Sequence, residues 1–155
     1  RLSLLACHYQ HHGIVYLSCC PQERVMSGDS VRLELPFPPK ELSPNARDGW
    51  RKKAKVVAQY REDCGWVGIA ERKRAYLWPG FQGSIEATVT FVVPDRRRRD
   101  LDNLLAMLKP AWDGLVDAGV LAGDDYTQFK VVPGAGGWVA VDKGRSCVNV
   151  ELRSV

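Results

Sequence analysis

The first regular element of the chain is marked by alternating apolar and polar positions. Residues 31–35 (VRLEL) are apolar at every second position, the period of a strand with one buried face. The residues that follow, 36–40 (PFPPK), form a proline cluster. Because proline has no N–H to donate to a β-ladder, this cluster is predicted to end the strand.

A helix with a basic face is predicted after this turn. Ser43-Pro44-Asn45 supplies cap and turn chemistry, and residues 48–61 fit a helix with one apolar stripe. The pattern allows this helix to continue past Gly65 to Lys73. Its basic positions are Arg51, Lys52, Lys53, Lys55 and Arg61, interleaved with Trp50, Val56, Val57 and Tyr60.

The middle of the chain predicts a central strand and a second helix. Residues 85–93 (IEATVTFVV) are rich in β-branched side chains, which is typical of a buried strand. Residues 102–118 carry apolar side chains at intervals of three and four, which gives a helix one buried face. Pro110 removes the hydrogen bond to residue 106 and should kink this helix, and Gly119 is placed to end it.

Two further strands, at residues 128–132 and 148–152, are predicted near the end of the chain. The glycine-rich stretch between them, with Pro133, Gly134, Gly136 and Gly137, is predicted to be a loop. The resulting order β-α-β-α-β-β indicates an α+β fold, with one mixed β-sheet and two main helices. A length of 155 residues, 45% of them hydrophobic, agrees with a single domain.

Charge and cysteine content limit the classes of protein to which this chain can belong. The formal net charge is +4, which is a modest excess. The clustering of the basic residues in blocks is more informative about function than this net charge. No apolar run approaches the ~20 residues that a membrane span requires, so no membrane partner is expected. The five cysteines are odd in number and form no Cys-x-x-Cys pair, which argues against a disulfide framework and predicts a cytoplasmic protein.

Residues 1–25 differ from the rest and are interpreted as an N-terminal extension of a domain spanning residues 26–155. They could form a zinc site, a lipoprotein cleavage box at residues 4–7 (LLAC), or a stretch that is not native. The last is favoured, with translation starting at Met26, because codons for Gln22-Glu23 can contain a ribosome-binding sequence. The zinc candidates, whose spacing matches no standard finger, are Cys7, His8, His11, His12, Cys19 and Cys20.

Residues 94–104 (PDRRRRDLDNL) hold the candidate chemistry. The arginine block consists of Arg96, Arg97, Arg98 and Arg99, and two of the aspartates of this motif, Asp100 and Asp102, follow it. Alternate side chains of an extended backbone share a face, so both carboxylates can point to one spot as the chain enters the helix. A second acidic pair, Asp124 and Asp125, follows the helix, and only the tertiary fold could bring it to the first pair.

Clustered carboxylates of this kind point to a hard cation. They repel one another and stay ionised at short range only where a cation compensates them. Oxygen ligands without paired His or Cys suit Mg²⁺, with Mn²⁺ as an alternative. Such a cation promotes phosphodiester hydrolysis, and guanidinium groups bind the polyanionic substrate. The predicted metal ligands are Asp100, Asp102, Asp124 and Asp125.

Each part of the motif also has a purely structural interpretation. Asp102 or Asn103 could cap the helix, and the acidic pair could form an ordinary turn after Gly123. The arginines could form a solvated edge. Their co-occurrence favours a metal-dependent nuclease, but the spacing alone leaves a non-catalytic nucleic-acid-binding module open.

The segment resembles the RusA family of Holliday junction resolvases. The similar features are residues 94–103, the helix end at residues 117–120 (DAGV) and the acidic pair, and residues 35–39 (LPFPP) look like the family's opening strand and proline turn. The resemblance covers about residues 26–155. It implies a homodimer that binds four-way DNA junctions in recombination and repair and nicks two strands symmetrically, using Mg²⁺.

The resemblance also implies residue roles. The family's three essential aspartates correspond to Asp100, Asp102 and Asp125, and Asp124 could replace or assist Asp125. The family's catalytic lysine corresponds to Ala106, which is a departure from the pattern. On a continuous helix Lys109 would share a stripe with Ala106, displaced by roughly 4.5 Å along the axis. Lys109 is therefore the candidate for that role, at the scissile phosphate or the leaving oxygen.

The basic helix is predicted to contact DNA through Arg51, Lys52, Lys53 and Lys55. Aromatic side chains lie among these residues, and a branched substrate requires a wide positive surface, although a solvated helix face is the alternative. Taken together, the sequence favours a Mg²⁺-dependent, structure-selective endonuclease acting on four-way junctions. A non-catalytic module and a related nuclease acting on flaps or forks are the competing hypotheses.

Overall fold

The computed structural model describes residues 10–11, 14–15, 30–47, 49–74, 79–125 and 127–155. Near the N-terminus, β1 (Gln10–His11) pairs antiparallel with β2 (Ile14–Val15). The predicted zinc ligands, the lipoprotein box and the start at Met26 concern side chains that lie outside the described residues. They therefore stay predictions.

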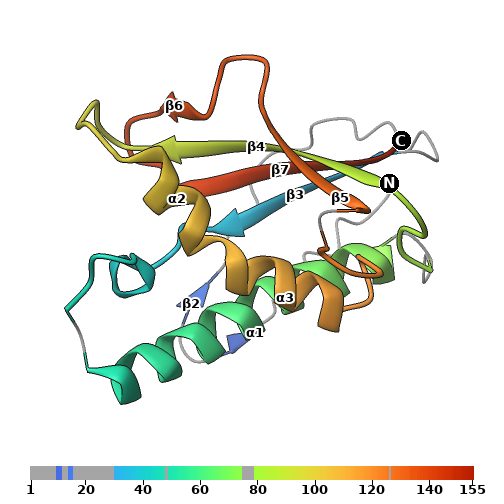
Figure 1. The fold of residues 1–155 in the computed structure, drawn as a ribbon, viewed down its shortest axis with the longest axis horizontal. Coiled ribbons are helices and arrows are strands. Elements are labelled where there is room, and N and C mark those ends of the chain that lie inside the picture. Colours follow the sequence, from blue (N-terminus) through green and yellow to red (C-terminus); the bar gives the residue numbers. More distant parts are fainter. Residues whose placement is uncertain (1–9, 12–13, 16–29, 48, 75–78, 126) are drawn as a thin grey trace, which may run out of the picture.

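The main sheet has five strands and mixed pairing (Figure 1). The strands are β3 (Ser30–Pro36), β4 (Ile85–Val93), β5 (Phe129–Pro133), β6 (Val139–Val141) and β7 (Cys147–Ser154). The order is β3-β7-β4-β5, and β6 pairs with the last residues of β4. The two pairings of β7 are antiparallel, whereas β5 and β6 run parallel to β4. The prediction of an α+β fold with β4 as a central strand is confirmed.

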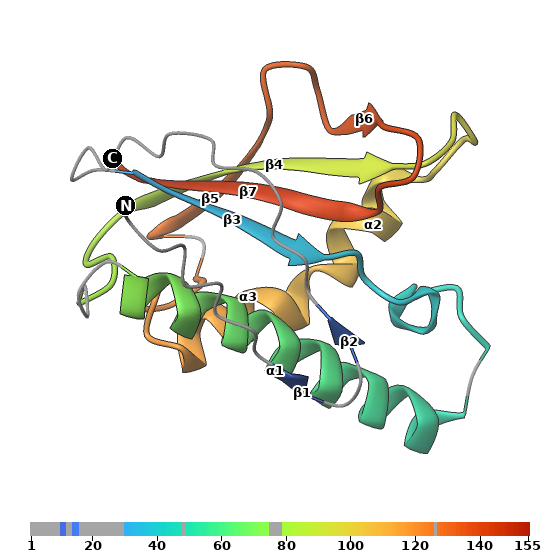
Figure 2. The ribbon, with the colours of Figure 1, turned by 180° about the vertical axis from the view of Figure 1, so that it is seen from behind.

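The helices lie along one side of this sheet (Figures 1 and 2). They are the short 3₁₀ helix η1 (Lys40–Leu42), α1 (Trp50–Arg74), α2 (Leu101–Met107) and α3 (Lys109–Asp117). Alternate residues of the central strands, such as Val89 and Phe91 in β4, are buried in one core with Leu108 and Leu115. The opposite positions carry polar side chains, such as Arg153, which pairs with Glu86 at 3.1 Å.

Helix α1 extends to Arg74, which confirms the longer of the two predicted lengths. Its glycines allow close contact with α3. A Cβ on Gly65 would lie 3.2 Å from the carbonyl oxygen of Gly114, and a Cβ on Gly114 would lie 2.2 Å from that of Arg61. Backbone atoms cannot swing aside as a flexible side chain can, so glycine at these two positions lets the helices cross with their backbones nearly touching.

The second predicted helix is divided at Leu108 into α2 and α3. The Leu108 N–H donates to the carbonyl of Leu105 at 3.1 Å, three residues back, which tightens the chain there. Pro110 lies in the first turn of α3, where its missing N–H costs no hydrogen bond. The predicted interruption is confirmed, but the single continuous helix used to align Lys109 with Ala106 is wrong.

Strand β6 lies where the sequence predicts a loop. Its three residues are all exposed, so the hydrophobic pattern contains no alternation between a buried and a solvated face. It forms because Trp138–Val141 runs alongside the end of β4, where the Phe91 N–H donates to the Trp138 carbonyl at 2.8 Å. Only the tertiary fold supplies this partner.

Candidate active site

The loop between β4 and α2 is organised by Asp95 and Arg99. The Asp95 carboxylate accepts the Arg97 N–H at 3.0 Å and the Arg99 guanidinium at 2.8 Å. The Arg99 guanidinium also donates to the carbonyl oxygens of Asp95 and Arg97, at 3.3 Å and 3.0 Å. The hydrogen bond from the Arg97 N–H, followed by that from Arg99, lowers the pKa of Asp95. Arg99 is therefore a structural member of the arginine block.

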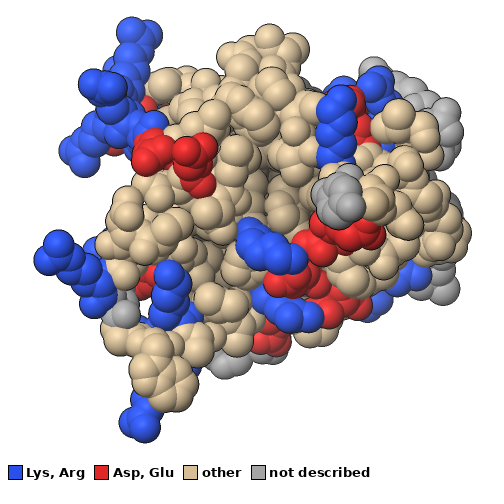
Figure 3. Space-filling view, in the orientation of Figure 1, with Lys and Arg blue, Asp and Glu red and all other residues tan. Residues whose placement is uncertain are grey.

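Arg96 and Arg98 are different, because both are exposed and neither makes an ion pair or hydrogen bond within the described residues. Arg97 is also largely exposed, and its guanidinium lies 3.5 Å from Asp95. Figure 3 shows these basic side chains gathered directly beside acidic ones, at the end of the molecule where β4 leads into α2. Unpaired guanidinium groups on a protruding loop are suited to contacting phosphates.

Asp100, the first of the two predicted metal ligands in this motif, caps α2. Asp100 has an extended backbone, and its carboxylate accepts the Asp102 N–H at 3.2 Å and the Asn103 side-chain amide at 3.0 Å. The helix begins at Leu101, so Asp102 lies in its first turn and not in extended chain as predicted. Capping, assigned from sequence to Asp102 or Asn103, belongs to Asp100 instead. The Asp102 carboxylate is exposed and has no hydrogen-bond partner within the described residues.

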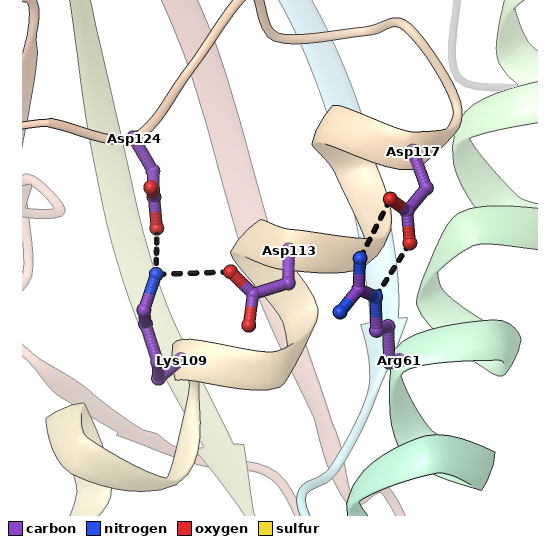
Figure 4. A network of polar contacts seen from close by, with 5 residues as sticks. All are labelled: Arg61, Lys109, Asp113, Asp117 and Asp124. Carbon is purple, nitrogen blue, oxygen red and sulfur yellow. Dashed lines mark hydrogen bonds and ion pairs between the residues drawn. The ribbon is translucent and has the colours of Figure 1, made fainter.

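The second acidic pair lies after α3, and its two members have different surroundings. The Lys109 ammonium donates to Asp124 and, at 2.9 Å, to Asp113 (Figure 4). The hydrogen bond to Asp124, followed by that to Asp113, raises the pKa of Lys109, so this side chain remains a cation. Lys109 therefore compensates two carboxylates that the helix and the following loop bring together.

Asp125 has the turn chemistry that its position suggests. Its carboxylate accepts both the N–H of Thr127, at 3.0 Å, and the hydroxyl of the same residue. These two hydrogen bonds lower the pKa of Asp125, the hydroxyl being the larger cause. The carboxylate is exposed and ionised, as a metal ligand must be, but it also holds the turn that leads into β5.

Two acidic partners in this region, Asp113 and Asp117, were not among the predicted site residues. Asp117 at the end of α3 accepts a two-point contact from the Arg61 guanidinium, at 2.5 Å and 2.7 Å (Figure 4). Asp113 lies four residues after Lys109 on the same helix, a spacing that predicts contact. The contact between Arg61 and Asp117 has no such local signal, because it joins α1 to α3 across 56 residues of sequence.

Carboxylate oxygens are the donors that Mg²⁺ prefers, so the donor chemistry fits the predicted cation. Among the described side chains, however, no three from His, Cys, Asp and Glu are grouped so that they could hold one metal ion. Asp100 and Asp102 are neighbours at the start of α2, and Asp124 and Asp125 are neighbours after α3. The fold supplies two carboxylate pairs rather than one assembled site.

The basic residues at the start of α1 lie on an exposed or half-buried face, and their predicted contact with DNA stays a prediction. Lys52 lies 3.8 Å from Glu41, and Lys53 donates to the carbonyl of Ser43 at 3.4 Å, so both contact the segment before the helix. Arg51 and Lys55 are exposed, and Arg51 lies over the Trp50 ring.

Tyr60, which lies among the basic residues in the sequence, belongs to the buried apolar stripe of α1 and not to the basic surface. Its side chain is only 2% exposed, and its hydroxyl donates to the carbonyl of Pro36 at 2.9 Å. Burial raises the pKa of Tyr60 far above its usual range and that of the neighbouring Cys64 thiol to about 12. Both groups therefore stay neutral, as members of the core.

Two proteins are similar in sequence to this chain. Over 120 residues the chain is 28% identical to the crossover junction endodeoxyribonuclease RusA of Aquifex aeolicus, a match that covers 77% of this chain and 86% of that protein. The chain is thus similar to a RusA endonuclease. Over 90 residues it is 39% identical to an uncharacterized protein of Xylella fastidiosa, a match that covers 56% of each chain.

The matched segment therefore spans little more than half the length of the Xylella protein, whereas the similarity to RusA covers most of both chains. No protein-family model matches this sequence. Of the helices in the part of the chain that the structure describes, none is long and apolar enough to cross a membrane.

Proposed function

We propose that this chain is a Mg²⁺-dependent endonuclease that cuts four-way DNA junctions in recombination and repair. The proposal is carried by the carboxylates of Asp100 and Asp102 at the start of α2, which follow the exposed Arg96 and Arg98 within a few residues of sequence. A cation site next to phosphate-binding groups is what phosphodiester hydrolysis requires. The similarity to the Aquifex RusA supports the same class of enzyme.

Asp100, Asp102 and Asp125 would hold the cation, with Asp124 assisting. Mg²⁺ is often held by only one or two carboxylates, while water and phosphate oxygens fill its other positions, so the Asp100–Asp102 pair is a sufficient starting site. When bound, Mg²⁺ or Mn²⁺ eases deprotonation of water and neutralises charge on phosphate oxygens. A phosphate oxygen of the substrate would supply a further ligand to a cation held by these carboxylates.

The other roles belong to the cationic side chains. Arg96 and Arg98 bind phosphates, and Lys109 contacts the scissile phosphate or the leaving oxygen when a phosphate replaces Asp124 as its partner. In the hydrolysis, a water oxygen bonds to phosphorus, the bridging P–O bond breaks, and the leaving oxygen takes a proton. Two copies in a homodimer would place one such site on each of two strands.

The test uses a labelled four-way junction, with Mg²⁺ or with EDTA. We expect paired nicks only with the metal, and Asp102→Asn should bind the junction but cut it at least about a hundredfold more slowly. The matched control is Glu151→Gln, which makes the same carboxylate-to-amide change on the outer face of the sheet, where Glu151 pairs with Arg32. Lys109→Ala cutting at the wild-type rate would remove Lys109 from the mechanism.

A non-catalytic nucleic-acid-binding module is the second candidate. It is favoured by one observation: Asp100 caps α2 and Asp125 holds a turn, which are structural tasks. Binding of the junction without cutting, in both Mg²⁺ and Mn²⁺, would establish this alternative and exclude the nuclease. Faster cutting of flaps or forks than of junctions would instead change the substrate class.

A further inference from the structure

Trp50, the first residue of α1, is unusually exposed for a tryptophan. Its side chain is 75% exposed, whereas Trp112 is buried in the core at 6%. Tryptophan is normally buried to a large extent, because its ring carries a large apolar area. The exposed indole of Trp50 is therefore a large, rigid aromatic surface that is available to a partner.

The Trp50 ring has a cationic neighbour, Arg51. The Arg51 guanidinium lies 5.3 Å from the centroid of the Trp50 ring, within the range of a cation–π contact. A guanidinium covers one face of a ring, and the large exposed fraction of Trp50 leaves the rest accessible. Trp50 therefore presents a flat apolar surface whose orientation is restrained and whose surroundings are positively charged.

The charge around this ring favours a polyanion over a protein or a lipid chain. Helix α1 has no acidic side chain in its first turn, and Arg51, Lys52, Lys53 and Lys55 follow Trp50 directly. The start of α1 and the arginine loop before α2 lie at the same end of the molecule in both views (Figures 1 and 2). Figure 3 shows separate groups of basic side chains at that edge, with uncharged surface and some acidic side chains between them.

We infer that Trp50, backed by Arg51, stacks on a nucleobase that loses its pairing partner at the branch point when the DNA binds. The inference rests on the proposed function, because it assigns the strand contacts of the same substrate. Every base has a flat π-face, so an aromatic side chain beside basic residues binds unpaired nucleotides with little sequence preference. A base within an intact duplex is already stacked and cannot offer that face.

The experiment measures binding in EDTA, so that no cleavage occurs. The probes are an unlabelled polythymidylate strand, a four-way junction and an intact duplex of matched length. We expect the polythymidylate strand and the junction to quench the intrinsic fluorescence of the wild-type protein, with most of that quenching lost in Trp50→Phe. Trp50→Ala should bind the strand and the junction roughly tenfold more weakly, with little change for the duplex.

The controls separate stacking from other effects. Trp66→Ala removes the other exposed tryptophan described on α1 and should leave all three affinities unchanged. Trp50→Phe should retain part of the lost affinity, because a benzene ring still stacks. Equal weakening of duplex and strand binding by Trp50→Ala, or no weakening of either, would overturn the inference.

Failure of this inference and failure of the proposed function give different results. Junction cutting by Trp50→Ala at the wild-type affinity and rate would overturn the stacking role alone. Selective loss of strand binding in Trp50→Ala, with no cutting by the wild type in Mg²⁺ or Mn²⁺, would support stacking and overturn the nuclease.

Discussion

Asp117 illustrates how single residues tie the helices together. Its carboxylate accepts two hydrogen bonds from Arg61, which lower the pKa of Asp117 below its usual value. A carboxyl group whose pKa is lowered by folding stabilises the folded state at pH values above its unfolded pKa, which is about 3.9. This contribution is lost as the pH falls through the lower pKa of the folded state. The pair thus stabilises the contact between α1 and α3 at neutral pH and not in acid.

We therefore expect the stability difference between wild type and Arg61→Gln to shrink as the pH falls from about 6 to about 3. Urea midpoints measured across this range give the difference directly. Lys55→Gln, which removes an exposed cation of the same helix, should show no comparable change with pH. A wild-type advantage over Arg61→Gln that stays constant down to pH 3 would contradict this account of Asp117.

Tyr60 is a second residue whose hydrogen bond stabilises the fold, in this case within the core. Tyr60→Phe removes the hydroxyl that donates to the Pro36 carbonyl and leaves that acceptor without its partner, so we expect a loss of about 1–2 kcal/mol in unfolding free energy. Denaturant titration measures this loss. Junction affinity should stay unchanged, because Tyr60 is buried on the side of α1 that faces the core. Weaker junction binding by Tyr60→Phe at unchanged stability would contradict this account and indicate that Tyr60 contacts DNA.

At the scale of elements, the close crossing of α1 and α3 depends on Gly114. Alanine is normally better than glycine in a helix by up to about 1 kcal/mol, but a Cβ here would lie 2.2 Å from the Arg61 carbonyl oxygen. The helices would have to separate, so we expect Gly114→Ala to lower the unfolding free energy by roughly 1–3 kcal/mol. Thermal or urea unfolding checks this, with Gly136→Ala, which meets nothing within 4 Å, as the neutral control.

The elements that could be predicted from the sequence are those with a periodic hydrophobic pattern. Residues 31–35 and 85–93 alternate or run apolar because one face or both are buried, and they form β3 and β4. The break at Leu108 was less predictable, since Pro110 fits into the first turn of a new helix. Strand β6 gave no signal, because its three exposed residues depend on β4 for their hydrogen bonds.

The candidate site was predictable only in part, for a similar reason. The position of Asp100 at the start of a helix and of Asp125 in a turn follows from local chemistry that spacing reveals. The contact of Lys109 with Asp124 depends on the path of the loop after α3, which no local pattern encodes. The structural role of Arg99 could not be predicted either, because the four adjacent arginines are equivalent in the sequence. Only the structure shows that Arg99 donates a hydrogen bond to Asp95.

At the scale of the whole molecule, the charges have two distinct arrangements. On the outer face of the sheet, arginines are paired with acids, as in Arg153 with Glu86 at 3.1 Å and Arg32 with Glu151 at 3.3 Å. At the end where β4 leads into α2, Arg96 and Arg98 have no such partner within the described residues. These two unpaired arginines are therefore available to attract a polyanion at that end.

This asymmetry predicts which arginines set the salt dependence of DNA binding. Each phosphate contact contributes roughly 0.9 to the slope of log K against log salt concentration on duplex DNA. Arg96→Ala with Arg98→Ala should therefore reduce the slope for a four-way junction by about 1.8, measured by fluorescence anisotropy in EDTA over a range of salt concentrations. Arg32→Ala with Arg153→Ala removes the same charge from the outer face and is the matched control. If both double variants lowered the slope equally, net charge rather than the arginine loop would steer the DNA, and the proposed site would lose its phosphate-binding half.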